Sequence, residues 1–104
     1  MGYRYLEGII PALVTPLDST GTKIDQSGMK NLINFLVDRG VNGLFPLGST
    51  GEGVLFDLET RKQTMDLIIQ EVNGRLPVVF HVGALRQQDV LVLAKFADEI
   101  GADG

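Results

Sequence analysis

The sequence between positions 43 and 53 reads Gly43-Leu44-Phe45-Pro46-Leu47-Gly48-Ser49-Thr50-Gly51-Glu52-Gly53, a short apolar run followed by a glycine-rich turn that carries two hydroxyls. Two further short apolar runs, at 8–14 and 77–82, are also bounded by glycine or proline. At this length a strand is favoured over a helix. Because none of the three runs alternates polar and apolar residues, we expect burial on both faces, as in a parallel sheet.

Between these predicted strands, the apolar residues repeat at the spacing of an amphipathic helix. The three stripes are Met29, Leu32, Ile33 and Leu36; Met65, Ile68, Ile69 and Val72; and Val90, Leu93, Ala94 and Ala97. Each stripe stops at a glycine suited to a helix C-terminus, namely Gly40, Gly74 and Gly101. Asp57 is the predicted N-cap of the second helix, with Glu59 favourable in its first turn.

The predicted order is therefore strand-helix, three times over. Parallel strands joined by helices form right-handed crossovers, which lead either to a doubly wound sheet or to a closed barrel. A short repeat, Gly-apolar-Asn/Asp-Gly, occurs at 40–43 before the second strand and again at 101–104. The second copy leads us to expect a fourth strand in a longer parent protein. Three strands alone leave open edges, so we expect the isolated chain to be aggregated, molten or swapped.

Composition excludes several functional classes. The chain has 104 residues, a net charge of −4 and no cluster of Lys and Arg, which argues against nucleic-acid binding. It has no cysteine, so disulfides, thiolate zinc sites and a cysteine nucleophile are excluded. No apolar run approaches the roughly 20 residues of a membrane helix. No secretory signal is visible, and we expect a cytoplasmic protein without a membrane partner.

The turn at 48–53 is the candidate site, because loops after parallel strands build active sites. Its glycines and hydroxyls suit an anion such as a carboxylate or a phosphate. The spacing Gly-x-x-Gly-x-Gly does not fit a dinucleotide-binding loop, and Ser49 stands where a phosphate-binding loop needs lysine. On spacing alone, a simple flexible connection between strand and helix remains equally open.

The sequence resembles the dihydrodipicolinate synthase and N-acetylneuraminate lyase family of class I aldolases. The matching segments are 8–18 (GIIPALVTPLD), 48–52 (GSTGE), 75–79 (RLPVV) and 100–104 (IGADG). The turn alone is moderately specific, whereas four matches in order at the right spacing are strong. The resemblance covers the whole chain, 1–104, and corresponds to a little over the first third of such an enzyme.

The resemblance implies an α/β fold, the TIM (β/α)₈ barrel, of which this chain supplies the first three units of one incomplete domain. It implies a pyruvate-binding homotetramer with no metal and no cofactor, in which a lysine on the sixth strand forms a Schiff base with the ketone. The catalytic residues carried by this chain would be Ser49, in a proton relay with tyrosines, and Thr50, which holds the pyruvate carboxylate. Gly48 and Gly51 would complete the substrate-binding turn.

The nucleophile itself is missing from the predicted strands. Lys23 lies in a polar loop, and the other three lysines lie on predicted helices: Lys30, Lys62 and Lys95. A Schiff-base lysine must be buried to lower its pKa. We therefore expect the 104-residue chain to be inactive by itself.

Two further residues invite catalytic roles. His81 is interpreted as a hydrogen-bonded histidine of the barrel interior rather than an acid-base catalyst. The segment 81–85 (HVGAL) resembles the lyases that act on sialic acid, and Ser49 in place of threonine favours the same subfamily. Glu52 is expected to anchor the turn by accepting backbone amides.

The resulting hypothesis is a lyase that cleaves a sugar acid to pyruvate and an aldehyde. The alternative within the family is 4-hydroxy-tetrahydrodipicolinate synthase, which condenses pyruvate with aspartate semialdehyde in lysine biosynthesis. Outside that chemistry, a non-catalytic half-barrel interaction module and a phosphate-binding barrel remain open.

Overall fold

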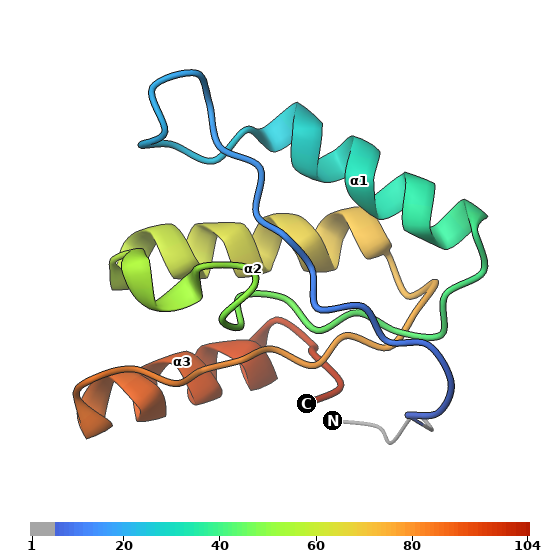
Figure 1. Ribbon diagram of the computed structural model, residues 1–104. Helices are drawn as coiled ribbons and strands as arrows, with labels where there is room; N and C mark the ends of the chain where they lie inside the picture. Colours follow the sequence, from blue (N-terminus) through green and yellow to red (C-terminus); the bar gives the residue numbers. More distant parts are fainter. Residues whose placement is uncertain (1–5) are drawn as a thin grey trace.

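The computed structural model describes residues 6–104. It contains three α-helices, α1 (Gln26–Asp38), α2 (Leu58–Val72) and α3 (Gln87–Glu99), and one short 3₁₀ helix, η1 (Gly53–Leu55). Extended segments at 8–14, 43–47 and 77–82 precede the three α-helices in turn (Figure 1). The predicted order of extended and helical elements is confirmed.

The helices begin and end where local chemistry favours it. The carboxylate of Asp25 accepts a hydrogen bond from the Gly28 amide (2.9 Å), and that of Asp57 accepts one from the Thr60 amide (2.8 Å). These bonds satisfy amides that have no partner inside the helix. Asn73, with φ of +48°, ends α2, and Gly40, with φ of +79°, follows the last turn of α1. The predicted N-cap at Asp57 is confirmed.

The core lies between the helices and the extended segments. Its fully buried helical members are Met29 and Ile33 on α1, Met65, Ile68 and Val72 on α2, and Leu93 and Ala97 on α3. The predicted stripes therefore face the core, with one exception. Ala94 is exposed, because the side of α3 on which it lies is not covered within residues 6–104.

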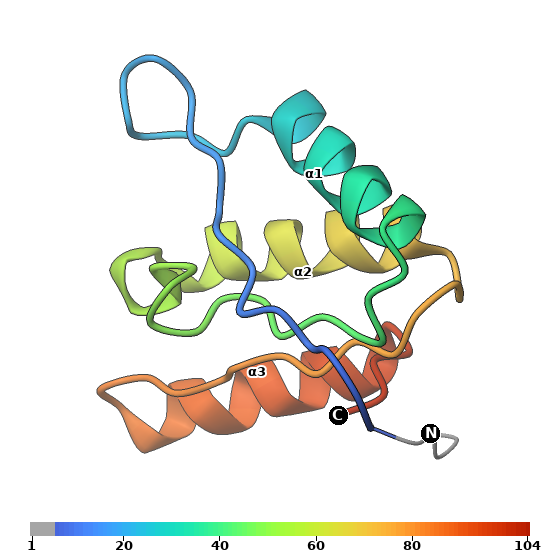
Figure 2. The same ribbon diagram turned by 45° about the vertical axis from the view of Figure 1, so that its right-hand side comes forward.

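The three extended segments run parallel, with 43–47 in the middle. Figure 2 shows the segment 77–82 running in front of α3. On one side, the Phe45 amide donates to the Pro11 carbonyl (3.0 Å) and the Leu13 amide donates to the Phe45 carbonyl (3.1 Å). On the other side, the Leu44 amide donates to the Pro77 carbonyl (3.0 Å), and the Leu44 carbonyl accepts from the Val79 amide (3.0 Å). Sequential segments are thus spatial neighbours.

The prediction of three regular strands is wrong in one respect, because the segments pair through isolated bridges and not through a continuous ladder. To continue beyond these bridges, a parallel ladder would need hydrogen bonds donated by the backbone nitrogens of Pro11, Pro46 and Pro77. Proline has no amide hydrogen, so each of these bonds is lost. At the far end Leu47 leaves the extended conformation with φ of +63°, which ends the pairing.

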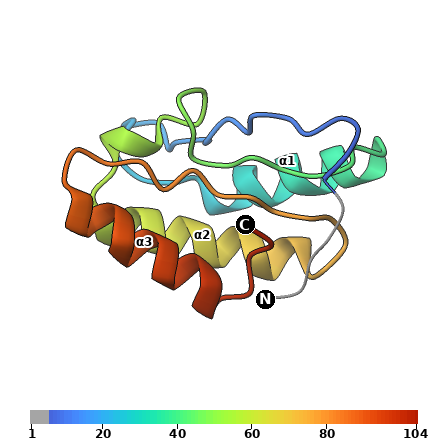
Figure 3. The same ribbon diagram turned by 90° about the horizontal axis from the view of Figure 1, so that it is seen from below.

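All three α-helices cover the same side of the parallel layer (Figure 3). A doubly wound sheet places helices on both faces, whereas a (β/α) barrel has sequential strands and helices only outside. The arrangement is therefore that of a barrel segment. The expected burial on both faces is not seen within residues 6–104: Val78 is 1% exposed on the helix side, and Val14 on the opposite side is 51% exposed.

The repeated Gly-apolar-Asn/Asp-Gly motif has the same structural role in both copies. Asn42 donates its amide to the Ile9 carbonyl (2.7 Å) and accepts the Ile9 amide at its side chain (2.9 Å). Asp103 donates its amide to the Val78 carbonyl (2.9 Å) and accepts the Val78 amide at its carboxylate (2.9 Å). Each motif thus fixes the register of its own segment on a preceding one.

The segment 102–104 continues the parallel layer beside 77–82, since the Phe80 amide donates to the Gly104 carbonyl (3.1 Å). It occupies the position expected for the beginning of a fourth strand. Within residues 6–104, no helix combines the length and apolar character needed to span a membrane.

Candidate functional site

The turn at 48–53 lies at the end of the layer where the parallel segments finish. It follows Leu47 directly and bends back so that the Gly53 amide donates to the Gly48 carbonyl (3.2 Å) and the Glu52 amide donates to the Ser49 carbonyl (3.1 Å). In (β/α) barrels this carboxyl end of the strands carries the active site. The turn therefore lies at the functional end of the barrel segment.

Two glycines allow the turn to fold so closely over the preceding segment. A Cβ atom on Gly53 would lie 2.0 Å from the carbonyl oxygen of Leu47. A Cβ atom on Gly51 would lie 2.7 Å from the Leu13 carbonyl oxygen and 2.9 Å from the Leu47 amide nitrogen. These are backbone atoms that cannot move aside cheaply, so the turn requires glycine at both positions.

A buried hydroxyl ties the turn to the first segment. Thr15 is 7% exposed, and its Oγ1 donates a 2.6 Å hydrogen bond to the Gly51 carbonyl. A satisfied bond in a partly dry environment is costly to break. The first and second segments are thereby joined at the same end of the layer.

The two candidate residues, Ser49 and Thr50, are both exposed. Within residues 6–104 neither hydroxyl makes a hydrogen bond, and the amides of Ser49, Thr50 and Gly51 donate to no other residue. Successive amides and hydroxyls without internal partners can bind an anion. The geometry leaves both side chains available to a ligand.

The third segment approaches the turn through His81. The carbonyl of Leu47 lies 3.2 Å from His81 Nδ1, and because a carbonyl can only accept, Nδ1 carries the proton. The ring packs edge-on against Phe45, with 6.2 Å between centroids and 80° between planes. His81 lies on the same side of the layer as Phe45, away from the helices, and the predicted hydrogen-bonded histidine is confirmed.

Sequence reasoning missed Arg61, which lies on α2 and is 2% exposed. Its guanidinium donates to the Gly83 carbonyl (2.7 Å) and to the His81 carbonyl (2.9 Å), while its Nε has no partner. Burial lowers the pKa of the Arg61 guanidinium. Its position one turn before Met65, on the apolar stripe of α2, was the signal that could have found it.

The prediction that the Glu52 carboxylate anchors the turn is wrong. The Glu52 side chain is exposed and makes no capping bond to η1. Instead its backbone shapes the turn through a left-handed conformation, with φ of +57°. The lysines fall as expected: Lys23 is in a loop, and none of the others lies on an extended segment of the described chain.

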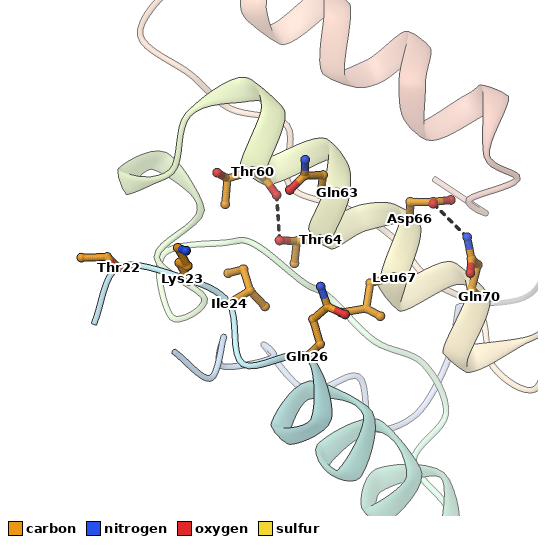
Figure 4. A pocket seen from close by; sticks show the side chains of 10 residues that line it. All are labelled: Thr22, Lys23, Ile24, Gln26, Thr60, Gln63, Thr64, Asp66, Leu67 and Gln70. Carbon is orange, nitrogen blue, oxygen red and sulfur yellow. Dashed lines mark hydrogen bonds between the residues drawn. The ribbon is translucent and has the colours of Figure 1, made fainter. Parts of the chain in front are cut away.

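The larger cavity, of about 460 Å³, lies away from the turn, between the loop at 17–24 and helices α1 and α2 (Figure 4). Lys23, Gln26 and Gln63 are among its lining residues, and Asp66 on its wall is already bonded to Gln70 (2.8 Å). A second cavity, of about 340 Å³, touches Glu52. Neither Ser49 nor Thr50 lines these two cavities.

Comparison with known proteins gives a consistent result. The sequence profile of the Dihydrodipicolinate synthetase family matches residues 5–104. The 4-hydroxy-tetrahydrodipicolinate synthase of Methanopyrus kandleri is 33% identical over 99% of this chain and 34% of its own length. The chain thus spans about a third of the length of the curated relatives it matches.

Solved structures show the same relationship. An N-acetylneuraminate lyase from Mycoplasma synoviae is 37% identical, with a TM-score of 0.88 over 93% of this chain and 33% of its own. A prophage protein of the dihydrodipicolinic acid synthase family from E. coli K12, solved in complex with pyruvate, is 37% identical, with a TM-score of 0.89 over 93% and 32%. The chain belongs to the dihydrodipicolinate synthetase family, and its fold is part of that family's TIM barrel.

Proposed function

We propose that this chain supplies the pyruvate-binding turn of a Schiff-base enzyme of the dihydrodipicolinate synthetase family. The observation that supports the proposal is the turn at 48–51, where the exposed Ser49 and Thr50 offer two hydroxyls and where three backbone amides are engaged by no residue in 6–104. Pyruvate presents a planar carboxylate, which hydroxyl and amide donors recognise well. Thr50 would hold this carboxylate, and Ser49 would belong to the proton relay.

The chemistry divides between this chain and the remaining part of a complete barrel. A lysine expected on the sixth strand attacks the ketone, and loss of water leaves an imine that withdraws electrons from the adjacent carbon. The turn fixes the carboxylate so that the ketone points at the amine. Holding reactants in this way can account for much of the rate enhancement.

For the second substrate, we propose aspartate semialdehyde, and therefore the condensing reaction of a 4-hydroxy-tetrahydrodipicolinate synthase. Curated relatives from several organisms carry this name, which favours it over the sugar-acid lyase. The lyase stays as a second candidate on two observations. The chain has His81-Val82-Gly83 at the end of the third segment and just after it, and the Mycoplasma synoviae lyase is 37% identical to the chain.

The experiment uses a hybrid barrel, in which residues 1–104 are joined to the remaining two thirds of the Mycoplasma synoviae lyase. Treatment with pyruvate and borohydride should reduce the imine and leave a stable mass adduct on one lysine. Thr50→Val should raise the pyruvate concentration needed for half-maximal labelling by about tenfold or more, as expected for a lost carboxylate contact. Asn31→Ala, a change at an exposed position of α1, is the control and should label like the parent.

Two results would refute the proposal: a folded hybrid that forms no adduct, or a Thr50→Val variant that labels like its parent. To separate the two reactions, a second hybrid carries the remaining two thirds of the Methanopyrus kandleri synthase. We expect residues 1–104 to preserve a larger fraction of the native rate in the synthase hybrid. A larger preserved fraction in the lyase hybrid would favour sugar-acid cleavage instead.

A further inference from the structure

Leu47 joins the second extended segment to the candidate turn in an unusual backbone conformation. It is 1% exposed and has φ of +63°, a region that residues with a Cβ atom rarely occupy. Such a conformation persists only where the surroundings hold it. Because Gly48, Ser49 and Thr50 follow at once, the orientation of the Leu47 peptide sets the direction in which the turn leaves the layer.

Two neighbours contact the carbonyl of Leu47. From one side, Gly53 packs so closely that a Cβ atom there would lie 2.0 Å from this oxygen. From another, His81 Nδ1 donates a hydrogen bond to it at 3.2 Å. The histidine bond is the only side-chain hydrogen bond that this carbonyl receives within residues 6–104.

His81 is itself held from several directions. Its amide donates to the Pro46 carbonyl (3.1 Å), and its carbonyl accepts from the Arg61 guanidinium (2.9 Å). Its ring packs edge-on against Phe45. Gly83 leaves room for the ring, since a Cβ atom there would lie 2.6 Å from the ring carbon Cε1 and 2.7 Å from Nε2. The imidazole is therefore fixed before any ligand binds.

We propose that His81 is a positioning residue for the turn at 48–51, acting through the Leu47 carbonyl to aim Thr50 at the carboxylate of a 2-keto acid. This inference rests on the proposed function, and it assigns His81 no contact with substrate. Preorganised donors bind an anion without the cost of ordering the turn at the moment of binding.

The chemistry of the bond provides a matched pair of variants. The Leu47 carbonyl needs a donor at the position of Nδ1. The amide nitrogen of asparagine lies near that position, whereas the longer glutamine side chain places its amide nitrogen closer to the position of Nε2. In the hybrid barrel, His81→Gln should raise the KM for pyruvate about tenfold, and His81→Asn should stay within about twofold of the parent. In both variants kcat should change less than KM, because the interaction acts on binding.

A double-mutant cycle separates positioning from a general loss of stability. If His81 acts through the turn, His81→Gln should add little to the KM change in a Thr50→Val background, since the contact that it aims is already lost. A full additional tenfold increase in that background would overturn the proposal. So would equal KM values for His81→Asn and His81→Gln.

Gly83→Ala offers a second variant that keeps the histidine. Its methyl group must displace the ring, and Gly83 has no left-handed backbone that would add strain of its own. We expect an increase in pyruvate KM of about five- to tenfold, and an unchanged KM would overturn the proposal. Absence of the borohydride adduct in the parent hybrid would instead refute the proposed function, so the two failures are distinguishable.

Discussion

The two ends of the parallel layer use polar side chains in opposite ways. At the amino end, Asn42 and Asp103 each form two hydrogen bonds to one residue of a neighbouring segment. At the carboxyl end, Thr15 and His81 bond to the backbone of the turn and of Leu47, while the hydroxyl of Thr50 is left without a partner inside residues 6–104. Polar groups fix the register at one end and form the candidate binding surface at the other.

This difference indicates how the barrel segment combines stability with a candidate binding site. Within the described chain, the positive-φ residue other than glycine at the amino end is Asn73, which ends α2, whereas at the carboxyl end Leu47 and Glu52 have left-handed conformations within or next to the candidate turn. Backbone strain of this kind costs on the order of 1–3 kcal/mol per residue. Substitutions at the carboxyl end should therefore affect ligand binding, and those at the amino end should affect only stability.

The largest effect is expected from Gly53→Ala. Its methyl group would meet the Leu47 carbonyl oxygen at 2.0 Å, so the turn must move. We expect a loss of about 3 kcal/mol in the free energy of unfolding of the hybrid barrel, together with loss of the pyruvate adduct. Urea denaturation and borohydride labelling measure the two effects.

Gly21→Ala is the matched control, because no atom lies within 4 Å of the added methyl group and only the backbone at φ of +73° is strained. It should cost about 1 kcal/mol and leave labelling intact. Equal losses for the two variants would contradict the steric explanation of the turn.

Arg61→Met should have the next largest effect. The carbonyls of His81 and Gly83 would each lose a bond to a charged donor, which together stabilise the carboxyl end by about 2 kcal/mol. Urea denaturation of the hybrid barrel gives the value, with the exposed Lys30→Met on α1 as the control. A more stable Arg61→Met variant would show that burying the charged guanidinium costs more free energy than its two hydrogen bonds provide.

A smaller effect is expected at the amino end. Asn42→Ala removes the side-chain bond to the Ile9 amide, and Asp103→Ala removes the bond to the Val78 amide. Each should lower the free energy of unfolding by about 1 kcal/mol and leave the pyruvate KM within about twofold. A large change in KM would mean that the two ends are coupled, and the contrast drawn above would fail.

The smallest effect concerns pH and is expected at the start of α2, just after the turn and η1. The Thr60 hydroxyl and amide hold the pKa of Asp57 below its ordinary 3.8. A lowered folded-state pKa means that the stabilisation is present above 3.8 and is lost as the pH falls through the folded value. The difference in melting temperature between the parent and Asp57→Ala should therefore shrink between pH 6 and about pH 3. A difference that stays constant would rule out ionisation of Asp57 as its source.

Much of the fold could be predicted because its signals are local. The helical stripes, the N-cap at Asp57 and the glycine ends follow from spacing and capping chemistry. The interrupted ladder could also have been predicted, but only with the strand register known. Pro46 removes a hydrogen bond only if its nitrogen faces a carbonyl of the neighbouring segment. Register is a non-local property that the positions of apolar residues in one strand do not specify.

The site was less predictable, for the same reason. The turn at 48–53 was found from its glycines and hydroxyls, yet the carbonyl of Leu47, a residue with positive φ, is contacted by Gly53 and His81, which lie 6 and 34 positions away. In the sequence, Arg61 looked like a surface residue, because charged side chains on helices are usually exposed. Its burial depends on the carbonyls of His81 and Gly83, distant in sequence, which accept hydrogen bonds from its guanidinium.

The paired bonds of Asn42 and Asp103 also bear on how the protein is made. In each case the residue that fixes the register belongs to the later segment, and its partner belongs to an earlier one. A chain emerging from the ribosome therefore presents the partner first and the fixing residue afterwards. The second segment and the segment at 102–104 therefore each carry the residue that aligns them on a segment already synthesised, so these two alignments can form in the order of translation.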